Sequence, residues 1–255
     1  MHKPATLPPA ATRVLLSFLL PITGGVALQV IVSLAMGIPS NILPGEQSGA
    51  SLLLAGAGAT SLFLGLRWHG LRPLGLRGHR SLYAGIGFAT LGWIVYIVAR
   101  VFVVSSYELP ISPNLARVFV YLFLFEALSL QLWAFGLLFR SVADWRGPLT
   151  AAISSGLLFG VVGFLFFDES FIADLNSIFF FLAWGLFYGL VRLRTGGILG
   201  TVIVQAMQSL TTWHILLPEA RPRPNELHTL YAATATFYLI FIWRLWPKEE
   251  ADYRV

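Results

Sequence analysis

The 255-residue chain contains no cysteine, which excludes disulfide bonds, thiolate metal sites and a cysteine nucleophile. Charged residues are also scarce, at 11% of the chain, whereas hydrophobic residues make up 56% and the mean hydropathy is +0.75. A soluble domain of this size would expose much of that apolar surface to water and would aggregate. The composition therefore predicts an integral membrane protein.

Long apolar runs are present where charge is missing. A helix needs about 17 to 25 apolar residues to cross roughly 30 Å of hydrocarbon, and the alternating pattern of a β-barrel is absent. We predict an all-α, polytopic transmembrane helical bundle of about eight spans. The predicted spans are 14–36, 50–66, 83–105, 115–139, 149–167, 175–191, 198–217 and 229–245.

The distribution of basic residues predicts the orientation of the bundle. Most of the 17 Lys and Arg fall on the side of both termini, whereas the loop 168–174 carries only acidic charge. Cytoplasmic loops retain Lys and Arg, so both termini are expected to be cytoplasmic. Lys3 and Arg13 precede the first apolar run, which we interpret as an uncleaved span. This bias accounts for the net charge of +5. We therefore expect the lipid bilayer as a partner and predict no binding of nucleic acid.

The span 115–139 contains Glu126 near its middle and Gln131 five residues later. A carboxylate in hydrocarbon costs at least a few kcal/mol, so it persists where it is paired, faces a polar cavity or has a function. Gln205 and Gln208 share one face of a later span. We hypothesise that these four residues line one hydrogen-bonded polar chamber. The alternative is that Glu126 is neutral or paired and that the glutamines only join helices.

Three stretches from the fourth span onward resemble the CPBP family, the membrane group of CAAX prenyl proteases and bacteriocin-processing enzymes also called Abi proteins. They are LQLWAFGLLFR (130–140), GPLTAAISSGLLFGVVG (147–163) and WGLFYGLVRLRTGGILGTVIVQAMQS (184–209). The family has a four-helix core with a Glu-Glu-x-x-x-Arg motif, a Phe-x-x-x-His motif and a later His, often followed by Asn. Scaffold positions agree, including Gly136, Phe159, Gly185 and Gly189. The small pairs 156/160 and 185/189 also predict close helix packing.

The positions that carry the family's chemistry are replaced in this chain. The residues at the Glu-Glu, Arg, first His, second His and Asn positions are Leu130 and Gln131, Phe135, Gly163, Gln205 and Gln208. Family members are thought to use the glutamates and histidines to hold a metal or to activate water. A catalytic zinc site needs about three ligands and an open position. The spans offer one carboxylate, Glu126, and one imidazole, His214, so we predict no resident metal.

The sequence favours one membrane domain over residues 1–255. We predict three accessory spans in 1–114, a CPBP-like four-helix core in 115–217, and a last span with a cytoplasmic tail in 218–255. The preferred function is that of a pseudoprotease that binds a membrane-protein partner or a hydrophobic or lipidated peptide. The alternative is an active intramembrane CAAX-type endopeptidase with Glu126 as the base and zinc or another divalent metal. A small-solute carrier is less favoured, because few ionisable groups line any path.

Overall fold

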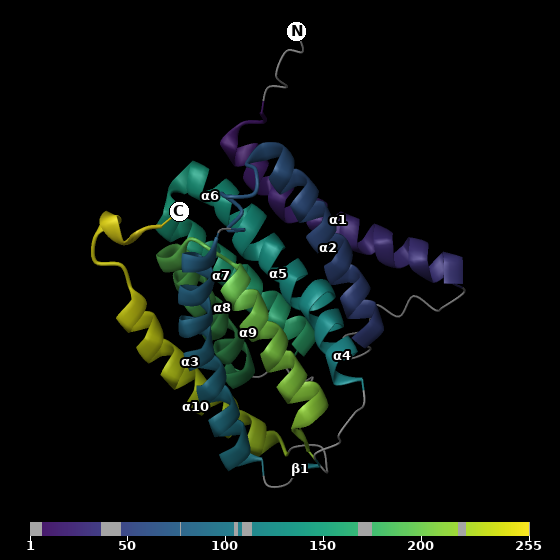
Figure 1. Cartoon of the computed structure of the whole chain (residues 1–255), viewed down its shortest axis with the longest axis vertical. Helices are drawn as coiled ribbons and strands as arrows, with labels where there is room; N and C mark the ends of the chain where they lie inside the picture. Colours follow the sequence, from purple (N-terminus) through teal and green to yellow (C-terminus); the bar gives the residue numbers. More distant parts are fainter. Residues whose placement is uncertain are drawn as a thin grey trace.

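The computed structural model describes residues 7–36, 47–76, 78–104, 107–108, 114–167, 175–218 and 223–254. In this part of the chain the helices form one bundle (Figure 1). The segments that are long and apolar enough to cross a membrane are Ala10–Ala35, His79–Val103, Leu115–Arg146, Pro148–Phe166 and Leu175–Thr195. The prediction of an all-α helical membrane bundle is therefore confirmed. The predicted acidic loop 168–174 lies outside the described residues.

The first two helices, α1 (Ala10–Met36) and α2 (Gln47–Trp68), cross at glycines. A Cβ atom on Gly56 would lie 2.6 Å from the carbonyl oxygen of Gly24, so the backbones meet where side chains are missing. The later part of α1 extends away from the bundle (Figure 1). The third helix, α3 (His79–Val103), packs instead against α9 and α10 on another side of the molecule.

One long helix runs from Leu115 to Arg146, and its α winding is interrupted by two π-helical segments. Its parts are α4 (Leu115–Tyr121), the π-helix η1 (Leu122–Leu128), α5 (Ser129–Gln131), the π-helix η2 (Leu132–Leu138) and α6 (Phe139–Arg146). Backbone hydrogen bonds in a π-helix span five residues, and such segments are frequent at functional sites. The hydroxyl of Ser129 accordingly donates to the carbonyl of Leu124, five residues back, at 3.0 Å. The predicted fourth span is thus confirmed and longer than expected.

The next two helices, α7 (Pro148–Phe167) and α8 (Leu175–Thr195), pack closely along their glycines. A Cβ atom on Gly156 would lie 2.7 Å from the carbonyl oxygen of Gly185, and one on Gly160 would lie 2.7 Å from that of Phe181. Real Cβ atoms do not approach backbone oxygens so closely, so these positions require glycine. The close packing predicted from the small residues is confirmed here.

The last part of the core is α9 (Leu199–Leu210), which continues as the π-helix η3 (Thr211–Ile215). The two-residue strands β1 (Tyr107–Glu108) and β2 (Leu217–Pro218) pair antiparallel beyond it. The bundle ends with α10 (Pro224–Leu245) and the short 3-10 helix η4 (Glu250–Asp252). The predicted seventh and eighth spans are therefore helical, although α9 on its own is short.

The C-terminal tail folds back onto the end of α8. The backbone N–H of Arg254 donates to the carbonyl of Leu193 at 2.9 Å, and Asp252 forms an ion pair with Arg194. Asp252 also accepts a hydrogen bond from the backbone N–H of Lys248 at 3.0 Å. That bond, followed by the bond from Arg194, holds the pKa of Asp252 below its ordinary value.

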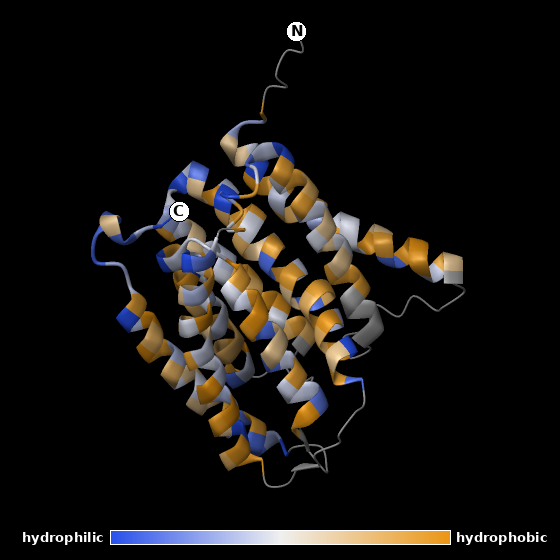
Figure 2. Ribbon diagram, in the orientation of Figure 1, coloured by the Kyte–Doolittle hydropathy of each residue, from blue (hydrophilic) through white to orange (hydrophobic). Residues whose placement is uncertain are grey.

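Hydrophobic residues make up much of each helix, and hydrophilic residues gather at the helix ends (Figure 2). Phe102 and Leu34 are examples of large apolar side chains that are almost fully exposed. In water such a surface would drive aggregation, whereas in a bilayer it contacts the lipid tails. The distribution identifies the chain as an integral membrane protein.

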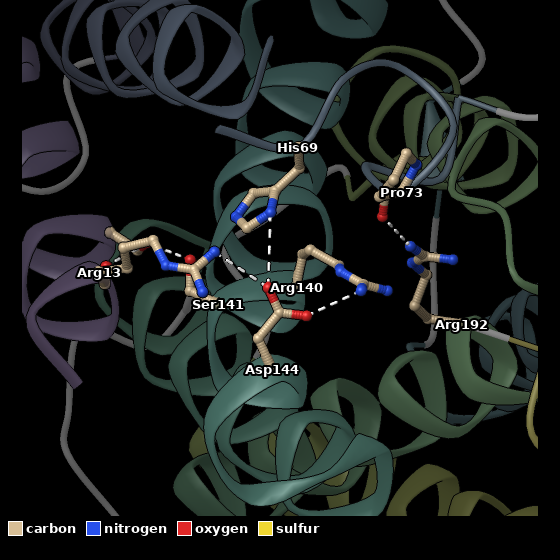
Figure 3. A network of polar contacts seen from close by, with 8 residues as sticks. Arg13, His69, Pro73, Arg140, Ser141, Asp144 and Arg192 are labelled. Atoms are coloured by element: carbon tan, nitrogen blue, oxygen red, sulfur yellow. Dashed lines mark hydrogen bonds and ion pairs between the residues drawn. The ribbon is translucent and has the colours of Figure 1, made fainter. Parts of the chain in front are cut away.

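A cluster of charged residues joins α1, α6 and the loop after α2 at one end of the bundle (Figure 3). Asp144 accepts from Arg13 at 3.0 Å and from Arg140 at 2.8 Å, and His69 Nδ1 lies 3.6 Å from the same carboxylate. Burial lowers the pKa of His69 to about 4, Asp144 partly opposes this shift, and the two arginines add to it. His69 is therefore neutral near pH 7.

Candidate functional site

Gln131 and Gln205 meet between the long helix and α9. Gln131 Nε2 donates to Gln205 Oε1 at 2.9 Å, and the hydroxyl of Thr201 donates to Gln131 Oε1 at 3.1 Å. All three side chains are buried. The amides therefore bond to each other and to Thr201, as buried polar groups in an apolar bundle require.

Glu126 lies in the π-helix η1 and is 7% exposed. Its carboxylate accepts a hydrogen bond from the hydroxyl of Ser209 on α9. Residues five apart lie closer to the same helix face in a π-helix than in an α-helix. The π winding therefore brings Glu126 nearer to the face that carries Gln131. A second polar link thus joins the same two helices.

Gln208 is next to Ser209 in the chain, but its side chain takes part in neither of these two sets of hydrogen bonds. Its Oε1 atom is buried and has no hydrogen-bond partner in the described part of the chain. Both residues line a small cavity of about 30 Å³ between α3, α8, α9 and α10. An unsatisfied acceptor in an apolar interior costs on the order of 1–3 kcal/mol, which marks Gln208 as a group that gains from a bound donor.

The four residues predicted to share a chamber are thus distributed over two bonded pairs and one cavity. Among the described residues no hydrogen bond joins Glu126 to Gln131, Gln205 or Gln208, so the single chamber stays a prediction. The hydroxyl partners Thr201 and Ser209 were not predicted from the sequence. Their spacing was the available signal, because Thr201, Gln205 and Ser209 lie four residues apart and share one face of α9.

The family-type metal site does not fit these residues. Leu130 and Gly163 are buried and carry no side-chain donor atom, and the amides of Gln131 and Gln205 are already engaged with each other. The described ranges contain no group of three or more His, Cys, Asp or Glu able to hold a metal ion. Neutral amides are poor zinc ligands. We therefore derive no reaction step through a metal.

Arg192 is a buried cation that was not predicted as a site residue from the sequence. It is 1% exposed, and its Nε donates to the carbonyl of Phe135 at 3.0 Å while its Nη2 donates to that of Pro73 at 2.8 Å. Its guanidinium also lies 4.9 Å from the ring centre of Phe139. The resemblance aligns Phe135 with the family's motif arginine. Arg192 brings a guanidinium to the backbone of Phe135 from another helix, and its contact with Pro73 is drawn in Figure 3.

Comparison with known proteins gives one family match. Residues 112–211 match the family described as type II CAAX prenyl endopeptidase Rce1-like. The match covers less than half of the chain and includes the long helix, α7, α8 and α9. No curated protein and no solved structure matches the chain.

The fold is that of a helical membrane protein, and the family match adds a region similar to CAAX prenyl endopeptidases. The resemblance inferred from the three sequence stretches is confirmed over residues 112–211, which are Rce1-like.

Proposed function

We propose that this protein has lost metalloprotease chemistry and works by binding a membrane-protein partner or a hydrophobic or lipidated peptide. The observation that carries the proposal is the hydrogen bond between Gln131 and Gln205. These residues occupy the second glutamate and second histidine positions of the family motifs. Two groups that would together grip a metal in a protease are instead joined by a hydrogen bond from one amide to the other.

The surroundings of that bond support a structural role. Thr201 supplies a third hydrogen bond, and Leu130 fills the neighbouring glutamate position with a fully buried apolar side chain. A binding protein keeps the scaffold and its buried surfaces without needing the ligands of a metal. The close glycine contacts of α7 with α8 hold this scaffold together.

The alternative is an active endopeptidase with Glu126 as the base. One observation favours it: the partner of Glu126, Ser209, lines the small cavity, so the carboxylate is one hydrogen bond away from that space. A base must reach the proton it removes directly or through one bridging group. This arrangement makes Glu126 the residue on which the two functions differ.

The experiment compares cleavage and binding on the same sample. Purified protein in lipid nanodiscs is incubated with a prenylated peptide ending in a CAAX sequence, with and without added zinc. We expect saturable peptide binding, no cleavage and less than stoichiometric metal after dialysis. Zinc-dependent cleavage that Glu126→Gln abolishes would establish the protease instead. Glu250→Gln, at the exposed turn η4, is the matched control.

The proposal includes an orientation with both termini in the cytoplasm. The start of α1 and the end of the chain lie at the same end of the bundle (Figure 1). Arg13, Arg140 and Arg194 lie near that end, and cytoplasmic faces are enriched in such residues. Labelling of single cysteines introduced at Leu7 and Arg254 by a membrane-impermeant reagent tests it. Labelling from the outside of intact cells would contradict it.

A further inference from the structure

A cavity of about 30 Å³ lies between α3, α8, the junction of α9 with η3, and α10. That volume is large enough for a water molecule or a polar group of similar size, so it accepts a small polar tip. Most of its wall is aromatic. The lining residues are Tyr96, Phe180, Phe181, Trp184, Gln208, Ser209, Thr212, Trp213 and Tyr231.

The aromatic wall is held in place by ring contacts. Phe180 stacks on Tyr96 with centroids 5.8 Å apart and on Tyr231 at 4.9 Å, and its edge meets Phe181 at 4.9 Å. These pairs bring together α3, α8 and α10. Because each ring is fixed by its neighbours, the cavity exists before anything enters it, which reduces the entropy lost on binding.

The polar side of the cavity offers acceptors. Gln208 is 5% exposed, and its Oε1 has no hydrogen-bond partner in the described part of the chain. Ser209 gives its only hydroxyl hydrogen to Glu126, so its oxygen keeps lone pairs and has no hydrogen left to donate. Two neighbouring residues therefore present acceptor atoms to a space the size of one hydroxyl group.

The cavity has one partly exposed side. Among its lining side chains all are buried except Trp213, which is half-buried and lies in the π-helix η3. Trp213 therefore marks the mouth. If a molecule enters past Trp213, only its end group fits inside the cavity. The rest of the molecule then contacts the apolar surfaces of the helices.

We propose that this cavity binds the hydroxyl group at the end of a membrane-soluble apolar molecule, a long-chain alcohol in its chemistry. The hydroxyl donates to Gln208 Oε1 and fits the space, whereas a carboxylate would lie close to the carboxylate of Glu126, which Ser209 contacts, and a larger headgroup would not enter. A cationic tip is disfavoured because the buried guanidinium of Arg100 already bonds to the wall residue Tyr96. The site stands whether or not proteolysis has been lost.

The test uses 1-dodecanol and its methyl ether, which has the same chain but no O–H donor. The full-length protein in detergent micelles is labelled with 5-fluorotryptophan, and the Trp213 resonance is assigned with Trp213→Phe. We expect a saturable shift of this resonance with dodecanol and none with the ether. Equal responses to both compounds, or no saturable response to the alcohol, would overturn the proposal. This result needs no substitution in the cavity.

A variant pair then locates the acceptor. Gln208→Leu removes the unpartnered oxygen and should weaken dodecanol binding about three- to tenfold, the range expected for one hydrogen bond. Gln29→Leu is the matched control, because Gln29 on α1 is also buried with an unpartnered Oε1 but does not line this cavity. Unchanged affinity in Gln208→Leu, or equal weakening in both variants, would contradict the assignment. Neither result bears on cleavage or metal content, which test the proposed function.

Discussion

Gln131 Nε2 donates to Gln205 Oε1 across 2.9 Å and thereby joins the middle of the long helix to α9. The resemblance to the CPBP family implies a glutamate and a histidine at these two positions. In this chain a hydrogen bond between neutral amides joins the two helices there. Its energetics are therefore open to a direct measurement.

Breaking this contact from one side should be costly. Gln131→Leu leaves the buried amide of Gln205 without its donor, and Gln205→Leu does the reverse, so each should lower the free energy of unfolding by about 1–3 kcal/mol. The double variant should lose less than the sum, because it removes both polar groups together. Denaturation in mixed micelles measures the cycle. Additive losses would show that the two amides do not interact.

A second prediction concerns Arg192. Replacing it by Met removes its hydrogen bonds to the buried carbonyl of Phe135 and the partly buried carbonyl of Pro73, and should destabilise the protein by several kcal/mol. Arg192→Lys keeps the charge but lacks the forked donor geometry, so it should recover only part of the loss. Thermal unfolding of both variants checks this, with Arg146→Met at the exposed end of α6 as the control. Full rescue by Lys would mean that charge alone matters.

The glycine contact between α7 and α8 yields a third prediction. Gly156→Ala would place a Cβ atom 2.7 Å from the carbonyl oxygen of Gly185, which forces the helices apart and should cost about 1–3 kcal/mol. Gly87→Ala on α3 is the control, because a Cβ atom there meets nothing within 4 Å. The unfolding temperatures of the two variants should differ clearly. Similar values would mean that the α7 and α8 backbones can separate without loss.

Much of the bundle follows from the sequence, because apolar length fixes where helices form in a membrane. Small residues at four-residue spacing likewise predicted that α7 and α8 pack closely against neighbours, and the structure shows that they pack against each other. The π-helices η1, η2 and η3 were not predictable in this way. Their surroundings include contacts between residues distant in the chain, such as the bond from Arg192 to the carbonyl of Phe135 in η2.

The candidate site was predictable only in part. Gln131 and Gln205 were expected to be near each other, since the family motifs align them with residues of one active site. Their hydroxyl partners Thr201 and Ser209 are common in membrane helices, so nothing in their identity marked them. The different environment of Gln208 depends on which residues of α3 and α10 reach α9, which no local pattern encodes.

The charged cluster around Asp144 predicts a dependence of stability on pH. His69 is 4% exposed, and burial lowers its pKa from 6.5 to about 4, so the unfolded chain takes up a proton in this range that the folded chain does not. Stability from this group is complete above pH 6.5 and is lost as the pH falls toward 4. The full effect is about 3 kcal/mol, and a large part should be visible between about pH 5 and 7.

Thermal unfolding at a series of pH values measures this dependence. His69→Gln removes the titrating group and should flatten the curve in that window, because Asp144, Arg13 and Arg140 then remain as the only charged groups in the cluster that the structure describes (Figure 3). His79→Gln, at the exposed start of α3, should leave the slope unchanged. If His69→Gln keeps the slope of the parent protein, burial of His69 is not its origin.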